Sequence, residues 1–272
     1  MILARLIPKH SKKYEDFNKK ISVYAELIEK YNVINLFSVW TVTVSGFSYM
    51  LGQIDRYSYW DWSGYNDGII RLILSTILFY VTSKNKILKL GSDRLTYLNL
   101  FFNVIICLMF FLIGAVNISM IEINIIGFLP YICSFVAGIV IYEFKISYDR
   151  KNDDWIIDSW DNMVSYLVLS FILMIVSAVI GYNLDDPIIS TVSMVSLFFP
   201  AVALIWPNHV RHIKRLQFYP LFILAMFTCV RSPWFLIVLG TLFFIIRSIN
   251  YLKYGITYPS FGVAQEETLA DV

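Results

Sequence analysis

The chain has 272 residues, of which 58% are hydrophobic and 15% are charged, and its formal net charge is only +2. Soluble domains carry about 25% charged residues. This many apolar side chains cannot all be buried inside one water-exposed fold, so they need lipid as a solvent. The small net charge excludes a nucleic-acid-binding protein that relies on a strongly basic surface. The composition therefore predicts an all-α, polytopic integral membrane protein.

Residues 1–31 are predicted to contain a cytoplasmic amphipathic helix that lies on the membrane surface. Apolar and aromatic residues recur there at alternating spacings of three and four, which places them on one stripe of a helix. Lysines occupy other positions, so apolar burial and attraction to anionic lipid act together. A coiled-coil partner is the alternative, but a stripe this short makes a weak zipper. The stripe comprises Tyr14, Phe17, Ile21, Tyr24, Ile28 and Tyr31.

Residues 32–252 are predicted to form a transmembrane helical domain of about eight spans. The lengths of the third to sixth apolar stretches are close to the about 20 residues that a helix needs to cross the hydrocarbon layer. The second and the last two stretches are shorter and rely on flanking aromatic residues, so seven spans is the alternative. The predicted spans are 32–52, 68–83, 97–116, 121–142, 163–182, 188–206, 217–231 and 233–250.

The basic residues predict which side of the membrane each segment occupies. Nineteen of the 22 lysines and arginines fall in segments that this arrangement places on one side, as the positive-inside rule requires. Both termini are therefore predicted to be cytoplasmic, in a plasma (inner) membrane. Residues 253–272 form a cytoplasmic tail that is predicted to be partly disordered, because glycine and proline interrupt it and its end is polar and acidic. The outer loop 53–67 is rich in tyrosine and tryptophan and suits an aromatic belt, with an outward ligand-stacking site as the alternative.

The most acidic stretch, SYDRKNDDWIIDSWDN at residues 147–162, falls on the predicted cytoplasmic side. If residues 153–164 are helical, three of its aspartates share one face. Mg²⁺ combines one or two carboxylates with substrate phosphates, so Asp153 and Asp158 are a candidate metal pair. The alternatives are a solvated connector that pairs loosely with basic loops, which we favour, and a docking face for a basic protein. The candidate acidic site comprises Asp149, Asp153, Asp154, Asp158 and Asp161.

The basic stretch NHVRHIKR, residues 208–215, is interpreted as a phospholipid headgroup contact. Two of its histidines are three residues apart, a spacing that can share a metal. No third ligand is evident nearby, and the basic neighbours disfavour a cation. The predicted headgroup contacts are His209, Arg211, His212, Lys214 and Arg215.

Ionisable residues within membrane helices are costly and often functional. Arg71, Glu122 and Arg231 lie near the outer ends of the second, fourth and seventh predicted spans. They form an outer-leaflet ion cluster if those spans meet. No predicted span carries a carboxylate or histidine at its midplane, which argues against proton-coupled transport.

Small residues four positions apart predict where helices approach closely. Ser134 with Gly138, and Ser177 with Gly181, have this spacing. Pro200 falls within a predicted span and is expected to kink it, which frees backbone carbonyls for other partners.

The sequence contains no nucleophile paired with a base, no metal-ligand set and no nucleotide motif that we recognise. The cysteines, Cys107, Cys133 and Cys229, stand alone in apolar runs and are interpreted as buried thiols. Whether the protein is an enzyme stays open, and we favour a non-catalytic role without a cofactor. That role is a subunit of a membrane complex, with a membrane or cytosolic protein partner, or a protein that binds or transports a lipid or small amphiphile. The alternative is a Mg²⁺-dependent transferase that acts on a phosphorylated lipid through the acidic stretch.

Overall fold

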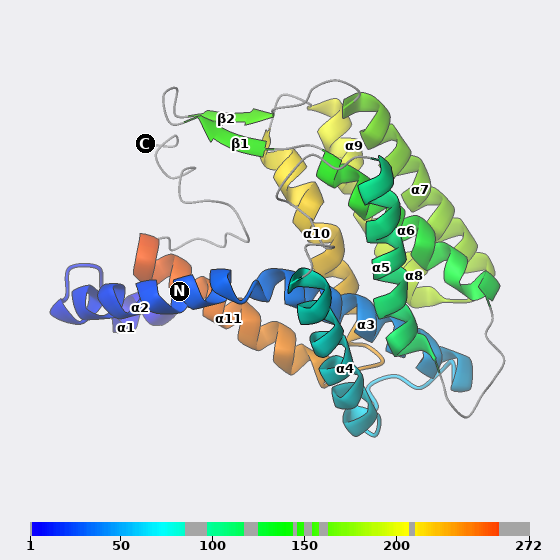
Figure 1. Cartoon of the computed structure of the whole chain (residues 1–272), viewed down its shortest axis with the longest axis horizontal. Helices are drawn as coiled ribbons and strands as arrows, with labels where there is room; N and C mark the ends of the chain where they lie inside the picture. Colours follow the sequence, from blue (N-terminus) through cyan, green and yellow to red (C-terminus); the bar gives the residue numbers. More distant parts are fainter. Residues whose placement is uncertain are drawn as a thin grey trace.

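The computed structural model describes residues 2–84, 97–116, 125–143, 146–149, 154–157, 163–206 and 210–255 (Figure 1). Helices make up nearly all of these residues, and one short strand pair completes the fold. The elements are α1 Ile2–Leu6, α2 Lys12–Lys30, α3 Val33–Ile54, α4 Tyr65–Lys84, α5 Tyr97–Ala115, η1 Ile125–Phe128, α6 Leu129–Ile139, η2 Val140–Glu143, β1 Ile146–Asp149, β2 Asp154–Ile157, α7 Met163–Asn183, α8 Pro187–Ser196, α9 Phe198–Ile205, α10 Val210–Thr228 and α11 Phe235–Tyr254.

The chain is a helical, multi-span membrane protein, as its composition predicts. Helical structure occurs at each of the eight predicted stretches. Among the described residues, five helices are long and apolar enough to cross a bilayer and two further apolar helices are shorter, so the count of eight stays a prediction. The five are Val33–Ile54, Tyr97–Ala115, Met163–Asn183, Pro187–Ile205 and Phe235–Lys253, and the shorter two are Ile125–Ile139 and Tyr219–Thr228.

Helices α3 and α5 touch backbone to backbone at two glycines. A Cβ atom added at Gly46 would lie 2.0 Å from the carbonyl oxygen of Phe111, and one added at Gly114 would lie 1.9 Å from that of Thr43. No other residue type fits at these positions without moving a helix. The second half of α3 is therefore fixed tightly against α5.

Hydroxyl groups join α7 to its neighbours α6 and α8. The Ser177 hydroxyl donates to the carbonyl of Pro130 (2.6 Å) and lies 2.7 Å from the hydroxyl of Ser193. A Cβ at Gly181 would lie 2.9 Å from a methyl group of Ile189. The predicted close approach at Ser177 and Gly181 is therefore confirmed.

Two other packing predictions have different outcomes. A Cβ added at Gly138 would have no atom within 4 Å, so the close approach predicted at Ser134 and Gly138 is wrong. The predicted irregularity near Pro200 is present, because α8 ends at Ser196 and α9 begins at Phe198. The helix breaks a turn before the proline, whose missing N–H cannot continue the hydrogen-bond ladder.

The acidic stretch contains strands where the sequence predicted a helix. β1 and β2 pair antiparallel, with Ile146 opposite Ile157 and Asp149 opposite Asp154. The apolar and aromatic run at 154–157 follows a polar segment, which is the pattern of a hairpin strand. Asp154 therefore belongs to a strand and not to a helical face with Asp158 and Asp161, which lie outside the described residues.

The helix α2 packs along the end of α11 and supplies hydrogen-bond donors to it. The Tyr14 hydroxyl donates to the carbonyl of Tyr251 (3.0 Å), and the Asn18 amide donates to the carbonyl of Leu252 (2.7 Å). The last carbonyls of a helix have no regular partner within it. The Tyr251 carbonyl also accepts from the backbone N–H of Gly255 (2.8 Å), and the Asn18 amide supplies a donor to the carbonyl of Leu252. Gly255 ends α11 in the left-handed conformation, with φ of 70°.

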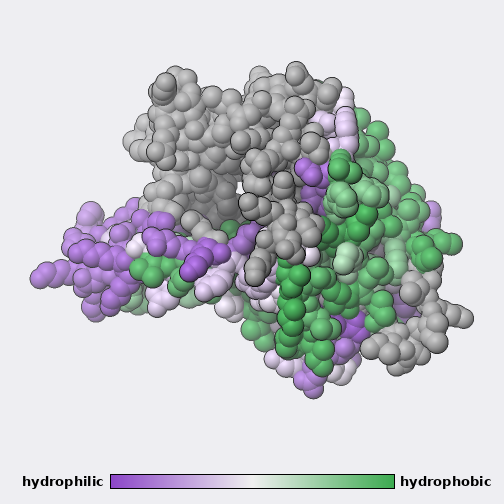
Figure 2. Space-filling view, viewed as in Figure 1, coloured by the Kyte–Doolittle hydropathy of each residue, from purple (hydrophilic) through white to green (hydrophobic). Residues whose placement is uncertain are grey.

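The predicted apolar stripe of α2 divides between two environments. Tyr14, Ile21 and Ile28 are half-buried, whereas Phe17 and Tyr24 stay exposed. Figure 2 shows hydrophilic surface gathered over α1 and α2, and hydrophobic surface over α5 and α7. The position of α2 on a membrane surface stays a prediction.

Candidate functional site

The turns that the sequence assigns to the outer side meet at one end of the molecule. Arg56, in the turn after α3, forms an ion pair with Asp185, in the turn after α7. The backbone N–H of Trp60 donates to the carbonyl of Val230 (2.7 Å), which lies in the turn before α11. The ends of α3 and α7 and the start of α4 accordingly lie together at the lower right of Figure 1.

The buried side chain of Arg231 connects several segments at this end of the molecule. Its side chain is 2% exposed, and its guanidinium donates to the carbonyls of Ser48 (3.4 Å) and Arg56 (3.2 Å). It also lies 5.5 Å from the ring centre of Tyr59, in a cation–π contact. A Cβ at Gly52 would lie 2.1 Å from the guanidinium, so a glycine leaves the space that this arginine fills. These contacts fix the first and last outer turns to each other.

Arg71 has a different set of partners. One guanidinium nitrogen donates to the carbonyls of Ile113 (2.7 Å) and Gly114 (2.8 Å), at the end of α5, and the other pairs with Asp67 at 3.0 Å. A cation at a helix C-terminus is favourable because the carbonyls there carry partial negative charge. Glu122 lies outside the described residues. The cluster of Arg71, Glu122 and Arg231 therefore stays a prediction, and its two arginines have separate partners.

Asp186 is a buried carboxylate that the sequence analysis did not single out. It is 7% exposed and accepts a hydrogen bond from the fully buried Tyr131 hydroxyl (2.7 Å). Its second oxygen accepts from the backbone N–H of Ile188 (3.1 Å) and caps the N-terminus of α8, with Pro187 at the first helical position. An aspartate followed by proline before an apolar run is a cap signal that the sequence does contain.

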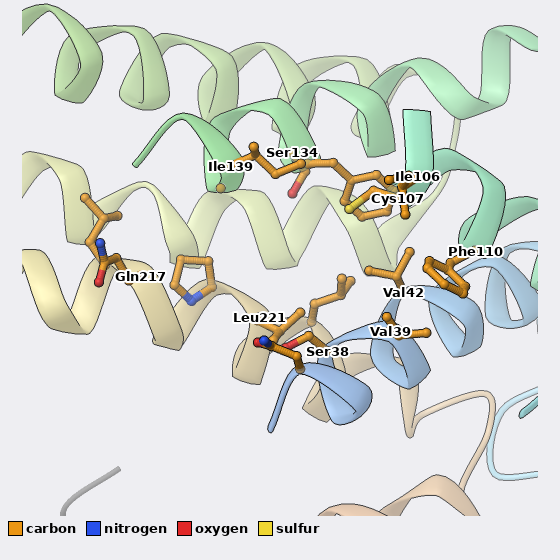
Figure 3. A pocket seen from close by; sticks show the side chains of 16 residues that line it. Ser38, Val39, Val42, Ile106, Cys107, Phe110, Ser134, Ile139, Gln217 and Leu221 are labelled. Carbon is orange, nitrogen blue, oxygen red and sulfur yellow. The ribbon is translucent and has the colours of Figure 1, made fainter. Parts of the chain in front are cut away.

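A cavity of about 120 Å³ lies between α3, α5, α6 and α10 (Figure 3). None of the turns described above contributes to its lining. Its walls come from four helices that are far apart in the sequence. The lining residues that Figure 3 labels are Ser38, Val39, Val42, Ile106, Cys107, Phe110, Ser134, Ile139, Gln217 and Leu221.

The polarity of the cavity wall changes along its length. Asn35 and Ser38, in the first turns of α3, and Gln217 of α10 supply polar groups at one end. Val42 and Phe110 line the part farther along α3 and α5. An elongated ligand with one polar and one apolar end matches this order of side chains.

Pro220 adds a backbone acceptor to the same wall. Proline lacks an N–H, so the carbonyl of Leu216, four residues earlier, loses its regular helical partner. Both residues line the cavity. A freed carbonyl can accept a hydrogen bond from a ligand hydroxyl or amide, and a nearby donor must otherwise satisfy it.

Only part of the predicted headgroup and acidic sites falls on described residues. His209 lies outside them, whereas Arg211, His212, Lys214 and Arg215 belong to the first turns of α10, directly before the cavity. Of the acidic site, the structure places Asp149 at the end of β1 and Asp154 at the start of β2. The remaining predicted residues, Asp153, Asp158 and Asp161, lie outside the described part of the chain.

Neither metal chemistry nor disulfide chemistry is evident in the described ranges. No group of three or more histidine, cysteine or acidic residues there is arranged to hold a metal ion. Cys133 and Cys229 are buried free thiols, as predicted, and Cys107 is partly buried in the cavity wall.

The chain matches no protein-family model, no curated protein and no solved structure.

Proposed function

We propose that this protein binds a lipid or small amphiphile in the cavity between α3, α5, α6 and α10, as a non-catalytic binding or transport protein. The order of polar and apolar side chains along the cavity supports this proposal. The ligand's polar end lies near Asn35, Ser38 and Gln217, and its apolar end extends toward Val42 and Phe110. In the proposed topology of eight spans with both termini cytoplasmic, the polar end faces the cytoplasmic leaflet.

The basic start of α10 favours an anionic polar end for this ligand. Arg211, Lys214 and Arg215 precede the cavity residues Leu216 and Gln217 on the same helix. Each basic residue near the surface contributes about 1 kcal/mol of attraction to anionic lipid. We therefore assign these residues, together with His209 and His212, to the headgroup contact.

The size of the cavity limits how much of the ligand it holds. An apolar cavity of about 150 Å³ accommodates a molecule such as benzene, so the cavity of about 120 Å³ here takes a short hydrocarbon segment. The remainder of a lipid would extend out of the cavity between the helices. This size suits the reversible capture of one tail more than the enclosure of a whole lipid.

The test fills the cavity without disturbing the packing. A Cβ at Gly138 meets no atom within 4 Å, so Gly138→Leu places its side chain in the cavity. Gly240→Leu is the matched control, because Gly240 is exposed on α11 and also has open space around it. Both changes improve helix propensity by a similar amount.

Native mass spectrometry of the gently solubilised protein gives the result. We expect Gly138→Leu to lower lipid occupancy about fivefold or more, which corresponds to about 1 kcal/mol, and Gly240→Leu to leave it unchanged. Equal occupancy in the two variants would exclude this cavity as the binding site. A protein partner at fixed stoichiometry, with no bound lipid, would favour the role of a complex subunit instead.

A second candidate function is a Mg²⁺-dependent transferase that acts on a phosphorylated lipid. One observation favours it: the register of the hairpin places Asp149 opposite Asp154. Carboxylate oxygens are the ligands that Mg²⁺ prefers, and two acidic residues at paired positions are of the type that can supply them. If Asp153→Asn and Asp158→Asn abolish the retention of Mg²⁺ or of a phosphorylated lipid, this second function is supported. Unchanged retention in both variants would count against it.

A further inference from the structure

A second apolar groove lies between α2 and α11, and its volume of about 400 Å³ exceeds that of the first cavity. In Figure 1 the two helices lie side by side, in the arm at the left of the molecule. Side chains from the second half of α2 and from the last turns of α11 form its walls. They are Ile21, Tyr24, Leu27, Ile28, Tyr31, Phe244, Ile245, Ser248 and Ile249, together with Val33 at the start of α3.

Two polar groups at this groove point to a ligand with a polar end. The buried hydroxyl of Ser248 has no hydrogen-bond partner among the described residues, although this side chain lines the groove. An unpaired buried hydroxyl is unfavourable, and a ligand acceptor would satisfy it. The Lys30 ammonium lies 5.8 Å from the ring centre of Tyr31, which also lines the groove. The ammonium of Lys30 thus lies beside one of the residues that line the apolar groove.

Basic and acidic residues are mixed around the axis of α2. Lys13, Lys20 and the groove residue Leu27 follow one another at intervals of seven, so they share one face of the helix, with Asp16 close to it. Lys30 lies on the side of the helix that also carries Glu15 and Glu26. The cation that the structure places against a groove residue is Lys30, beside the ring of Tyr31.

We infer that the groove between α2 and α11 binds one acyl chain of an anionic phospholipid, with the phosphate of that lipid beside Lys30. The lining of the groove is apolar apart from Ser248 and the tyrosine hydroxyls, which suits a hydrocarbon chain, and the Lys30 ammonium beside Tyr31 complements a phosphate. The Ser248 hydroxyl donates to an ester carbonyl of the lipid. The bound lipid bridges α2 to α11, so the N-terminal helix is held on the membrane by a single stoichiometric site in addition to diffuse attraction.

This inference is independent of the ligand proposed for the cavity between α3, α5, α6 and α10. The test uses the full-length protein, freed of lipid in a mild detergent and titrated with phosphatidylglycerol or with phosphatidylcholine of the same acyl chains. Native mass spectrometry counts the bound lipids. The titration is made in the wild type and in Gly138→Leu, in which the first cavity is filled, so that failure at one site is distinguishable from failure at the other.

Two pairs of matched variants define the site. Ile245 lines the groove and is 40% exposed, so Ile245→Trp fills the groove, whereas Ile237→Trp makes the same change at a residue that is 61% exposed two turns earlier on α11. Lys30→Gln removes the cation at the groove. Lys12→Gln removes one from the far end of α2, on the same face of that helix as Lys30.

We expect the first phosphatidylglycerol to bind about fivefold tighter than phosphatidylcholine, as one well-placed lysine allows. Ile245→Trp abolishes this binding and Lys30→Gln removes the preference, while Ile237→Trp and Lys12→Gln resemble the wild type. Equal binding of the two lipids would overturn the inference. So would equal losses in Lys30→Gln and Lys12→Gln, which indicate diffuse attraction, or a lipid-free dimer that Ile245→Trp dissociates, which indicates a second copy in the groove. Lys30 is exposed, so the test does not depend on whether the tryptophan variants fold.

Discussion

The two halves of α3 differ in how they pack, although both are buried. The C-terminal half touches its neighbours through glycines, with Gly46 against the backbone of α5 and Gly52 against the guanidinium of Arg231. The N-terminal half presents Ser38, Val39 and Val42 to a cavity. The helix α3 is therefore closely packed at one end, called the sealed end below, and borders a cavity at the other, called the hollow end.

This difference indicates that the two halves of α3 have different roles. A close-packed end resists changes of volume, because an interior at crystal density has no space for additional atoms. The hollow end has space for additional atoms, which either a larger side chain or a bound ligand can supply. The protein is expected to be rigid where its outer turns meet and adaptable where α3, α6 and α10 surround the cavity.

The largest expected effect comes from one added side chain at the sealed end. Gly46→Val places atoms within 2.0 Å of the Phe111 carbonyl, so α3 and α5 must separate. We expect a loss of about 3 kcal/mol or more, at the upper end of the range for overpacking, and a chain that is recovered poorly. Thermal unfolding in one detergent, followed by tryptophan fluorescence, measures this loss. Gly138→Leu adds a larger side chain at the hollow end and is expected to unfold at or above the wild-type temperature. Equal losses in the two variants would refute the contrast between the two ends.

The next effect separates two adjacent aspartates at the sealed end. Asp186→Ala removes the N-cap of α8 and leaves the buried Tyr131 hydroxyl without its acceptor. We expect this change to lower stability by about 2 to 3 kcal/mol. Asp185→Asn removes an exposed ion pair with Arg56 and keeps a residue type that tolerates the left-handed backbone at this position, where φ is 62°, so its expected cost is below about 1 kcal/mol. The unfolding temperatures of the two variants are compared directly. A larger loss in Asp185→Asn would show that the surface pair, and not the buried cap, secures these turns.

The positions of the helices could be predicted from the sequence. A segment that crosses lipid must form all its backbone hydrogen bonds within itself, so it is a helix, and it is recognisable in the sequence as a long apolar run. Alternating spans place every second turn on one side of the membrane, and the turns after α3 and α7, and the turns after α3 and before α11, contact each other in agreement with that order. Which side is the outer one stays a prediction. The close approach at Ser177 and Gly181 was visible from small-residue spacing. These features are local or depend only on the order of the spans.

The cavity and the buried carboxylate could not be predicted with the same reasoning. Gly138 has the spacing of a packing residue, yet it borders empty space, because the distance between α6 and α10 depends on side chains of four separate helices. Asp186 was not singled out from the sequence, although its place before Pro187 is a cap signal. Residues 153–164 were considered as a helix because the aspartates of that segment have helical spacing, whereas the tryptophan and isoleucines at 155–157 favour a strand. In each case a local pattern was compatible with two structures, and contacts with distant residues decided between them.

A smaller effect is expected at the polar end of the hollow half. Pro220→Ala restores an N–H to the partner position of the Leu216 carbonyl and straightens α10. If that carbonyl holds the ligand, lipid occupancy falls about fivefold, the equivalent of one hydrogen bond of about 1 kcal/mol. Stability is expected to stay equal or to rise, because the helix gains a backbone hydrogen bond. Native mass spectrometry and thermal unfolding of the same sample separate the two results. Unchanged occupancy would place the polar end of the ligand away from α10.

The smallest effect concerns the attachment of α2 to α11, outside the two halves of α3. Burial, followed by the neighbouring Tyr251 hydroxyl, raises the pKa of Tyr14 above its ordinary value. The unfolded-state pKa of tyrosine is about 10, so the contribution of Tyr14 to stability is complete below that pH and is lost as pH rises through the folded-state pKa. We expect the wild type to lose unfolding temperature between pH 8 and about 11 more steeply than Tyr14→Phe, because phenylalanine does not ionise. Tyr24→Phe is the control, since Tyr24 is exposed on the same helix. If Tyr14→Phe and Tyr24→Phe lose unfolding temperature with the same slope, the hydrogen bond from Tyr14 to α11 does not contribute to holding the N-terminal helix in place.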